Sequence, residues 1–408
     1  MFLKLLDRHI RRGTLTVVEP DGARHTFGAG DPSATWVLKA PGTARRILLN
    51  PGANLGETYM NEEWDVEGGA LADLLTVLRV NMERNLPGRS VAALLGPLAT
   101  LVTSWNNVRA SLSNVSHHYD LDEALFRGFL DRDMHYSCAY FREADLSLEA
   151  AQAAKCDHIR RKLNLTAGQR VLDIGCGWGS LAMHLAERSG VEVVGLTLSG
   201  EQLRAARAEA ERRGLADRVE FRLEDYRQHR AEYDAVVSVG MFEHVGRRNF
   251  KRYFEKVLDF LAPHGTALLH TIGQSTPPSP TNPWIRKYIF PGGYIPSASE
   301  ILQEVEPSGL ILSDLEVWRR HYALTLRKWN RRFQAVRDEF VAAKGERFCR
   351  MWEFYLLACA TAFEVADLVV FQLQLARAND TVPLTRDYLY GASTEPAGEG
   401  RQPRFAAR

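Results

Sequence analysis

An acid and an imidazole directly follow an apolar run in the segment SVGMFEHVG, residues 238–246. The pattern of residues 233–239 is typical of a buried strand, so Glu243 and His244 are expected just beyond its carboxyl end. A carboxylate and an imidazole at one site can hold or move a proton. A pair of this kind also occurs in many folds without a chemical role, so this stretch alone leaves the catalytic and the structural interpretation open.

A glycine-rich loop is the strongest local motif of the chain. The sequence VLDIGCGWGS places Gly175, Gly177 and Gly179 between a strand at 170–174 and a helix. Glycines at such a turn let the backbone approach a ligand closely. The spacing is G-x-G-x-G, whereas a dinucleotide fold uses G-x-G-x-x-G, and the preceding Asp173 suits a cation better than a phosphate. The loop resembles motif I of S-adenosylmethionine-dependent methyltransferases; the alternative is a glycine-rich turn without a ligand.

Further candidate cofactor contacts follow the second and third strands of this region. Most such methyltransferases carry an acid after the second strand, but this chain has Thr197 there, with Gln202 five residues later. These two side chains can supply the missing hydrogen bonds, and Gln202 also has capping-box spacing from Ser199. Asp225 and Tyr226 follow the third strand, beside the expected adenine position, although Asp225 suits a helix cap equally well.

Strands and helices alternate from about residue 165, which predicts a parallel sheet with helices on both faces. The expected class is α/β: a Rossmann-like doubly wound methyltransferase sheet with a small N-terminal α+β domain and helical insertions. The expected strands are 170–174, 191–198, 218–223, 233–239, 266–272, one near 310–318 and 368–376. Two long helices are expected over about 323–364, and 273–296 is an insertion rich in proline and aromatic residues.

The domain boundaries follow from changes in composition. Residues 1–85 form the N-terminal domain, with a hairpin over 13–28, a strand at 35–40 and a helix over 68–81. A linker over 86–115 precedes the catalytic domain at 116–390, and 391–408 are expected to be a disordered tail.

Composition narrows the classes of function. The net charge of +1 argues against a nucleic-acid partner. Five cysteines without C-x-x-C spacing argue against disulfides and a structural zinc site, and no other metal site is predicted. The sequence shows no signal peptide, and its apolar stretches at 91–102 and 351–376 are too short or too charged to span a bilayer. We therefore expect a cytoplasmic protein that contacts the inner membrane surface at most peripherally.

Several motifs in order resemble one family. They are HYDLDEALF (118–126), HYSCAYF (135–141), MFEHVG (241–246), LLHTIG (268–273), PWIRKYIFPGGYIP (283–296) and RRHYALTL (319–326). As a set, over about 115–376, they resemble cyclopropane fatty acid synthases. Residues 1–85 resemble the accessory domain of the bacterial phospholipid-modifying members, a domain that the mycolic-acid branch generally lacks.

The resemblance implies roles for individual residues. The positions that hold a bicarbonate ion in the family match Cys138, Glu243, His270, Tyr322 and the backbone of Ile272. The positions that contact S-adenosylmethionine match Tyr136, Ser137, Gly175, Gly177, Thr197, Gln202, Tyr226 and Arg227. Considered alone, Cys138 could equally be a buried structural thiol and Tyr322 a tyrosine at the edge of the core.

The reaction implied by the resemblance is addition of a methylene group from S-adenosylmethionine to the cis double bond of an unsaturated phospholipid chain. The alkene attacks the sulfonium methyl, and a proton must then leave the resulting carbocation before the ring closes, with water excluded. The resemblance implies bicarbonate as the base, oriented by Glu243. It also implies a homodimer, and the aromatic insertion is expected either to line the acyl channel or to pack as an ordinary loop. The alternatives are an enzyme forming a methyl or methylene branch, one methylating a small amine, and a lipid-binding protein with an inactive core.

Overall fold

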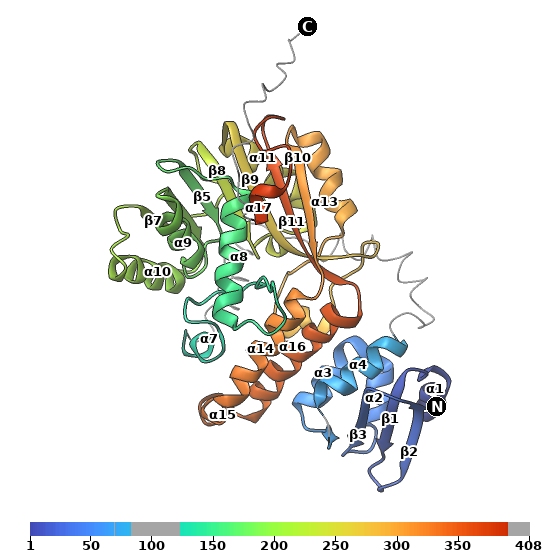
Figure 1. Ribbon diagram of the computed structural model, residues 1–408. Coiled ribbons are helices and arrows are strands. Elements are labelled where there is room, and N and C mark those ends of the chain that lie inside the picture. The colour runs from blue at the N-terminus through green and yellow to red at the C-terminus, as the bar shows by residue number, and fades with distance from the viewer. Residues whose placement is uncertain (69, 83–122, 391–408) are drawn as a thin grey trace.

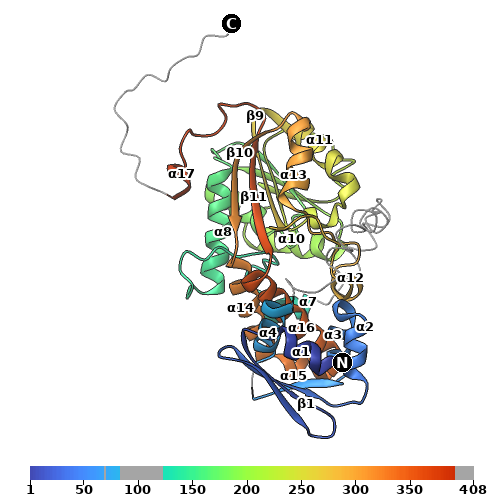
Figure 2. The same ribbon diagram turned by 90° about the vertical axis from the view of Figure 1, so that its right-hand side faces the viewer.

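The structure, a computed structural model, describes residues 1–68, 70–82 and 123–390 (Figure 1). The predicted linker and tail, and the first five residues of the motif at 118–126, lie outside these ranges. Two sheets organise the described chain: a four-stranded sheet of order β2-β1-β3-β4 and a seven-stranded sheet of order β10-β11-β9-β8-β5-β6-β7. Figure 2 shows the larger sheet at the top and the N-terminal unit below it.

The seven-stranded sheet confirms the predicted alternation of strands and helices. Its strands are β5 (Arg170–Ile174), β6 (Glu192–Thr197), β7 (Val219–Leu223), β8 (Tyr233–Val239), β9 (Leu261–Gln274), β10 (Ile311–Trp318) and β11 (Leu368–Ala376). The strands from β7 to β9 run parallel, but β11 is antiparallel to both β9 and β10. The predicted parallel arrangement is therefore confirmed for the five strands of the alternating region, whereas β11, for which no direction was predicted, is inserted antiparallel between β9 and β10 after the long helices.

Helices cover both faces of this sheet. On one face, α8, α9 and α10 share an apolar cluster with β5, β6 and β7; on the other, α11 and α13 share a second cluster with β8, β9 and β11. Local signals set their ends: Ser147 and Ser199 cap the first turns of α8 and α10, and Ser297 forms a capping box with Glu300 at α13. The helices of this part are α7 (Glu123–Phe129), α8 (Leu148–Lys162), α9 (Ser180–Ser189), α10 (Gly200–Arg212), α11 (Phe250–Phe260), α12 (Pro283–Tyr288), α13 (Ala298–Val305) and α17 (Asp387–Tyr390), with the short 3-10 helices η1 (Phe242–His244), η2 (Arg247–Asn249) and η3 (Glu306–Ser308).

The N-terminal unit is built on the smaller sheet. The predicted hairpin is confirmed: β1 (Gly13–Val18) and β2 (Arg24–Ala29) pair antiparallel. Strand β3 (Ser33–Leu38) lies parallel to β1 and antiparallel to β4 (Trp64–Glu67). Its helices are α1 (Phe2–His9), α2 (Thr43–Leu49), α3 (Pro51–Met60) and α4 (Leu71–Met82), the last of which confirms the predicted helix.

Three helices, not two, fill the region between the last two strands of the large sheet. They are α14 (His321–Ala335), α15 (Arg337–Lys344) and α16 (Glu346–Val365). The expectation of two helices was wrong because the chain breaks twice: Val336, with a φ of -119° and a ψ of 11°, separates α14 from α15, and Gly345, with a φ of +82°, separates α15 from α16. These helices lie between the N-terminal unit and the large sheet (Figure 1).

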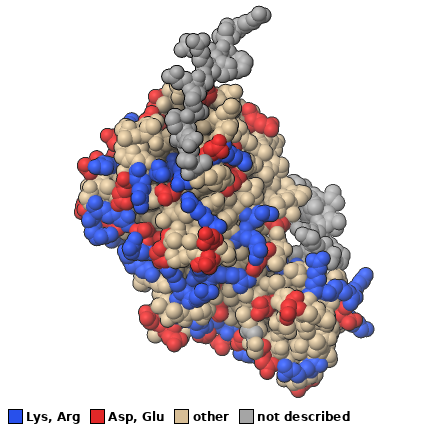
Figure 3. All heavy atoms as spheres, in the orientation of Figure 1, with Lys and Arg blue, Asp and Glu red and all other residues tan. Residues whose placement is uncertain are grey.

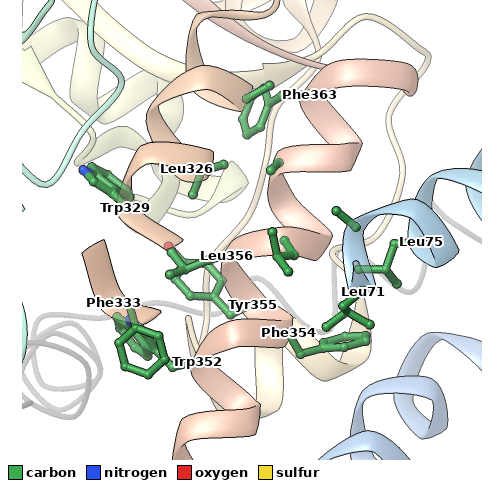
Figure 4. Packing of buried hydrophobic residues seen from close by; sticks show 14 of the residues in the cluster. Leu71, Leu75, Leu326, Trp329, Phe333, Trp352, Phe354, Tyr355, Leu356 and Phe363 are labelled. Atoms are coloured by element: carbon green, nitrogen blue, oxygen red, sulfur yellow. The ribbon is translucent and has the colours of Figure 1, made fainter. Parts of the chain in front are cut away.

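One apolar core joins the N-terminal unit to these helices. The cluster includes residues of α4, α14 and α16, and Figure 4 shows Leu71 and Leu75 of α4 facing Phe354 of α16. Buried Arg350 adds polar contacts, since its guanidinium donates to the carbonyl oxygens of Tyr59 (2.7 Å) and Trp64 (3.0 Å). The N-terminal unit is therefore packed against the rest of the chain through both apolar and hydrogen-bonded contacts.

Candidate active site

A pocket opens beside the carboxyl ends of β5, β6 and β8, where ligands bind in doubly wound sheets. Gly175 and Gly177 line it, and both have positive φ, +82° and +54°. A Cβ on Gly175 would lie 2.8 Å from the Met241 side chain, whereas one on Gly177 would meet no atom within 4 Å. Glycine at 177 thus keeps open a space that a side chain would fill.

The side chains of Thr197 and Gln202 meet in the pocket wall. The Thr197 hydroxyl donates to Gln202 Oε1 at 2.9 Å, and both residues line the pocket. The Ser199 hydroxyl accepts from the Gln202 backbone N–H at 3.3 Å. The cap at Ser199 therefore exists, but the Gln202 side chain turns to Thr197 instead of returning to the Ser199 backbone as a full capping box requires.

The loop after β7 supplies another part of the wall, with Asp225, Tyr226 and Arg227. Asp225 accepts from the Arg227 backbone N–H at 2.9 Å and pairs with its guanidinium at 2.6 Å. No helix begins here, so Asp225 stabilises a turn and does not cap a helix. Burial raises the pKa of Tyr226, which keeps its hydroxyl neutral.

The segment before α8 completes the pocket with Tyr136 and Ser137. The Tyr136 hydroxyl lies 2.9 Å from the Tyr355 hydroxyl of α16, and Ser137 Oγ accepts from Lys155 Nζ at 3.0 Å. Lys155 also lines the pocket although only 1% of its surface is exposed. The sequence analysis missed this lysine; the available signal was a lysine within the alanine-rich stretch at 150–156, which reads as the buried face of a helix.

Two predicted cofactor residues do not line this pocket. Asp173 is buried, and burial raises its pKa to about 7, against the opposing effect of Lys155. Gly179 begins α9, and a Cβ there would lie 2.4 Å from the ring of Phe221. The structure therefore gives Gly179 a packing role at the helix start and places Asp173 behind the loop.

Glu243 and Ile272 come together at the ends of β8 and β9. The Ile272 backbone N–H donates to Glu243 Oε1 at 2.5 Å, whereas Oε2 has no hydrogen-bond partner among the described residues. Burial raises the pKa of Glu243 to about 7, while the Ile272 N–H opposes that shift. An orphaned oxygen on a buried carboxylate is costly, which indicates a site that receives a hydrogen-bond donor.

His244, unlike Glu243, lines the pocket that Gly175 and Gly177 also line. Burial lowers its pKa to about 4, so the imidazole is neutral near pH 7. Its ring lies 5.9 Å from that of Phe290, in an edge-to-face arrangement. The acid and the imidazole of the opening motif therefore serve two neighbouring sites and do not act as one pair.

The remaining three predicted catalytic residues are buried around the same strand ends. Burial raises the pKa of Tyr322, and nearby Tyr136, Cys138 and Glu243 raise it further. Cys138 and Tyr322 come from segments that are hydrogen-bonded together, since the Ala139 N–H donates to Thr325 of α14 at 3.1 Å. Burial also raises the pKa of Cys138, which keeps a neutral thiol there.

His270 lies on β9, two residues before Ile272, and its carbonyl accepts from the Gly240 N–H at 2.9 Å. Burial lowers the pKa of His270 well below its ordinary value, and Lys155 contributes to the shift. Its Nδ1 lies 3.0 Å from Nε2 of Gln372, a second residue that the sequence analysis missed. The signal for Gln372 was a pair of glutamines, at 372 and 374, within an otherwise apolar strand.

The aromatic insertion divides between two environments. Trp284 packs on Phe354, with ring centroids 4.9 Å apart, and the Tyr288 hydroxyl donates to Glu57 of α3 at 3.0 Å. These two residues therefore join the insertion to the N-terminal unit. Phe290 faces His244 and, at 5.8 Å, Tyr355, so it lies closer to the pocket. Tyr294 donates to Glu300 of α13 at 2.7 Å.

Comparison with known proteins agrees with this architecture. The family described as mycolic acid cyclopropane synthetase matches residues 106–373. The cyclopropane-fatty-acyl-phospholipid synthase of Escherichia coli is 41% identical over 350 residues, covering 85% of this chain and 89% of that protein. A tuberculostearic acid methyltransferase of Mycobacterium tuberculosis is 37% identical over 391 residues, covering 92% of this chain and 90% of that protein.

Solved structures agree as well. The mycolic acid cyclopropane synthase CmaA1, in complex with SAH and CTAB, is similar with a TM-score of 0.62 and 33% identity, over 65% of this chain and 98% of that chain. The fold and the glycine-lined pocket thus define an S-adenosylmethionine-dependent methyltransferase. Within that class, the chain belongs to the mycolic acid cyclopropane synthetase family, which confirms the resemblance seen in the sequence.

Within the described ranges, no helix combines the length and apolar character that crossing a membrane requires. The face seen in Figure 3 carries Lys and Arg side chains interspersed with Asp and Glu. Such mixing of charges is typical of a surface that faces water.

Proposed function

We propose that this enzyme transfers a methylene group from S-adenosylmethionine to the cis double bond of unsaturated acyl chains in phospholipids, forming a cyclopropane ring. The observation that carries the proposal is the Glu243 carboxylate, buried, held at Oε1 by the Ile272 N–H and without a hydrogen-bond partner at Oε2 among the described residues. The similarity to a cyclopropane-fatty-acyl-phospholipid synthase supports the substrate class.

We propose that Gly175, Gly177, Thr197, Gln202 and Tyr136 bind the methyl donor. The space beside Gly177 fits this role, because a side chain there would occupy the pocket. The Thr197–Gln202 pair offers hydrogen bonds where related methyltransferases use an acid. Ser137, Tyr226, Arg227 and Asp225 complete the wall.

Bicarbonate is the proposed resident group of the second site, and when bound it supplies the base that accepts a proton during ring closure. The donors and the acceptor around the site fit a small, partly protonated anion. Tyr322 is neutral and buried, so its hydroxyl offers a proton for a hydrogen bond; the neutral Cys138 thiol, which donates to the Ala139 carbonyl at 3.4 Å, would have to turn from that carbonyl to the anion. Glu243 offers the matching acceptor at Oε2, and the Ile272 N–H fixes its orientation.

The burial of the side chains around the proposed base also excludes water from the site. Cys138 is fully buried and His270, Glu243 and Tyr322 have at most 8% of their surface exposed. A carbocation that meets water becomes an alcohol, so closing the ring requires a dry site. The side chains around the proposed base therefore hold the reacting groups and keep water from the cation.

A single assay tests the reaction. The purified protein is incubated with S-adenosylmethionine and vesicles of monounsaturated phospholipid, and the released fatty acids are analysed by mass spectrometry and NMR. We expect a gain of one CH₂ together with cyclopropane proton signals. No gain, despite measured binding of S-adenosylmethionine, would contradict the proposed substrate and favour a small amine or another acceptor.

A methyl- or methylene-branched product is the second candidate, because a fatty acid methyltransferase is 37% identical over most of the chain. Such an enzyme forms the same carbocation. A methylene branch results when the cation loses a different proton, and a methyl branch results only when a hydride donor, which the assay must then include, reduces the product. Vinyl or methyl signals in place of cyclopropane signals in the same NMR spectrum would support this candidate.

We propose a peripheral contact with the cytoplasmic face of the membrane through the N-terminal unit. Leu49, 76% exposed at the end of α2, lies beside exposed Arg45 and Arg46, a combination suited to an anionic lipid surface. Leu49→Asp is expected to weaken sedimentation with anionic vesicles, and unchanged sedimentation would refute the contact. A homodimer is proposed as well, and analytical ultracentrifugation tests it.

A further inference from the structure

His270 and Gln372 face each other across two adjacent strands. They are register partners in the antiparallel pairing of β9 and β11, so their side chains lie on the same face of the sheet. Both are buried, with 2% and 0% of their surface exposed. The Gln372 amide nitrogen lies 3.0 Å from His270 Nδ1, which is a hydrogen bond in which the amide donates.

This contact determines which ring nitrogen carries the proton. A neutral imidazole has one N–H, and His270 is neutral because burial lowers its pKa well below the ordinary value. Since Nδ1 accepts from the amide, the proton must reside on Nε2. Nε2 then faces its surroundings as a hydrogen-bond donor, which is the role that an anion site requires.

The ring is also fixed in orientation. The edge of Trp318 packs against it, with ring centroids 5.2 Å apart and planes at 84°. Gln372 Oε1 has no hydrogen-bond partner among the described residues, so the amide carries a desolvation penalty that an apolar residue would avoid. The presence of a glutamine at this buried position, despite the penalty, is explained if its amide N–H is needed to hold His270.

We infer that Gln372 is a positioning residue that holds His270 as the Nε2–H tautomer, so that the imidazole donates a hydrogen bond to the anion. The inference rests on the proposed function, because it assumes that His270 helps to hold bicarbonate. Gln372 itself touches neither substrate nor anion and acts through the imidazole.

The tautomer is measured directly by long-range ¹H–¹⁵N NMR on the full-length protein labelled at histidine. The His270 signals are assigned by their loss in the His270→Phe variant. We expect the coupling pattern of a neutral ring protonated at Nε2. A ring protonated at Nδ1 would mean that the amide accepts instead of donating, and the inference would be overturned whatever the activity of any variant.

A variant tests the consequence for catalysis. Gln372→Met keeps the length of the side chain and removes the donor, so we expect kcat to fall about tenfold, as for the loss of one buried hydrogen bond, with KM for S-adenosylmethionine unchanged. The His270 NMR signals should show both tautomers. A wild-type kcat together with an unchanged tautomer would refute the positioning role.

The matched control is Gln374→Met. Gln374 lies two residues away on the same strand and face and is 1% exposed, but its side chain bonds to the Lys162 carbonyl and to Tyr388 at 3.0 Å. This variant should leave both kcat and the His270 tautomer unchanged.

Dependence on bicarbonate separates the inference from the proposed function. The wild-type reaction is followed in carbonate-free buffer with and without added bicarbonate. An enzyme indifferent to bicarbonate, but with His270 protonated at Nε2, would contradict the proposed anion and leave the Gln372–His270 relation intact. A reaction that depends on bicarbonate, in an enzyme with His270 protonated at Nδ1, would support the proposed anion and overturn the Gln372–His270 relation.

Discussion

Replacement of Glu243 by glutamine should remove activity and at the same time stabilise the fold. The carboxylate is buried, and burial raises its pKa from the ordinary value of 4.5 to about 7. Each pKa unit corresponds to about 1.36 kcal/mol, so the ionised side chain lowers the free energy of unfolding by about 3 kcal/mol above pH 7. Glutamine has nearly the same shape, cannot ionise, and avoids this cost.

The sign of the pH dependence follows from the direction of the shift. Because the pKa is higher in the folded state, the contribution of Glu243 to stability is fully present below pH 4.5 and is lost as the pH rises through about 7. The Glu243→Gln variant should therefore match the wild type in stability near pH 4.5 and exceed it by about 3 kcal/mol at pH 8. Urea denaturation at the two pH values measures the difference.

Activity provides the second readout of the same variant. An amide cannot orient the base as a carboxylate does, so turnover should be lost, while calorimetry should give nearly unchanged binding of S-adenosylmethionine. A stable variant with the wild-type rate would contradict the role assigned to Glu243. Equal stability of the two proteins at pH 8 would show that the carboxylate is not held in a dry site.

Three further outcomes are expected. First, at saturating bicarbonate kcat should rise with pH through about 7, because ionised Glu243 offers both oxygens as acceptors whereas the protonated acid carries an O–H on one of them, and a flat profile would contradict this. Second, Gly177→Val should weaken binding of S-adenosylmethionine at least about tenfold by calorimetry, since the side chain enters the pocket; Gly214→Val, which has a similar positive φ and open surroundings outside the pocket, should not. Third, Arg350→Met should lower the free energy of unfolding by about 3 kcal/mol, whereas Arg347→Met, at an exposed position, should change it by less than about 0.5 kcal/mol. Equal effects of the two arginine variants would contradict the buried role of Arg350.

The sequence predicted most of the large sheet because its signals are local. Apolar runs, the glycine loop at 175–179 and the cap at Ser199 each act within a few residues, so strands and helices could be placed along the chain. The antiparallel direction of β11 could not be predicted, because it depends on where a strand returns after three helices. Likewise, Gly345 is a local signal for the break between α15 and α16, but the break between α14 and α15 falls at Val336, which carries no local helix-stop signal.

The residues of the candidate site also fall into two groups, those that local motifs signalled and those that only packing brings to the site. Residues within motifs, such as Glu243 and Thr197, were found because the motif itself signals a role. Lys155 and Gln372 were missed because each reads as part of an ordinary helix or strand, and only the packing of distant segments brings them to Ser137 and His270. The aromatic insertion was expected either to line the acyl channel or to pack as an ordinary loop; its Trp284 packs on Phe354 of α16 and against Gly56, a contact between residues far apart in the chain.

The contacts of α16 affect how the protein unfolds. Its residues contact the N-terminal unit through Arg350 and Phe354 and the pocket through Tyr355, all within two turns. A heat-capacity scan should accordingly show no separate transition for the N-terminal unit, since its core is one cluster with residues of α14 and α16. For the same reason, the surface of α16 that the N-terminal unit covers is apolar. Removal of the N-terminal unit from this chain would thus expose this apolar surface of α16. The truncated protein is therefore expected to self-associate.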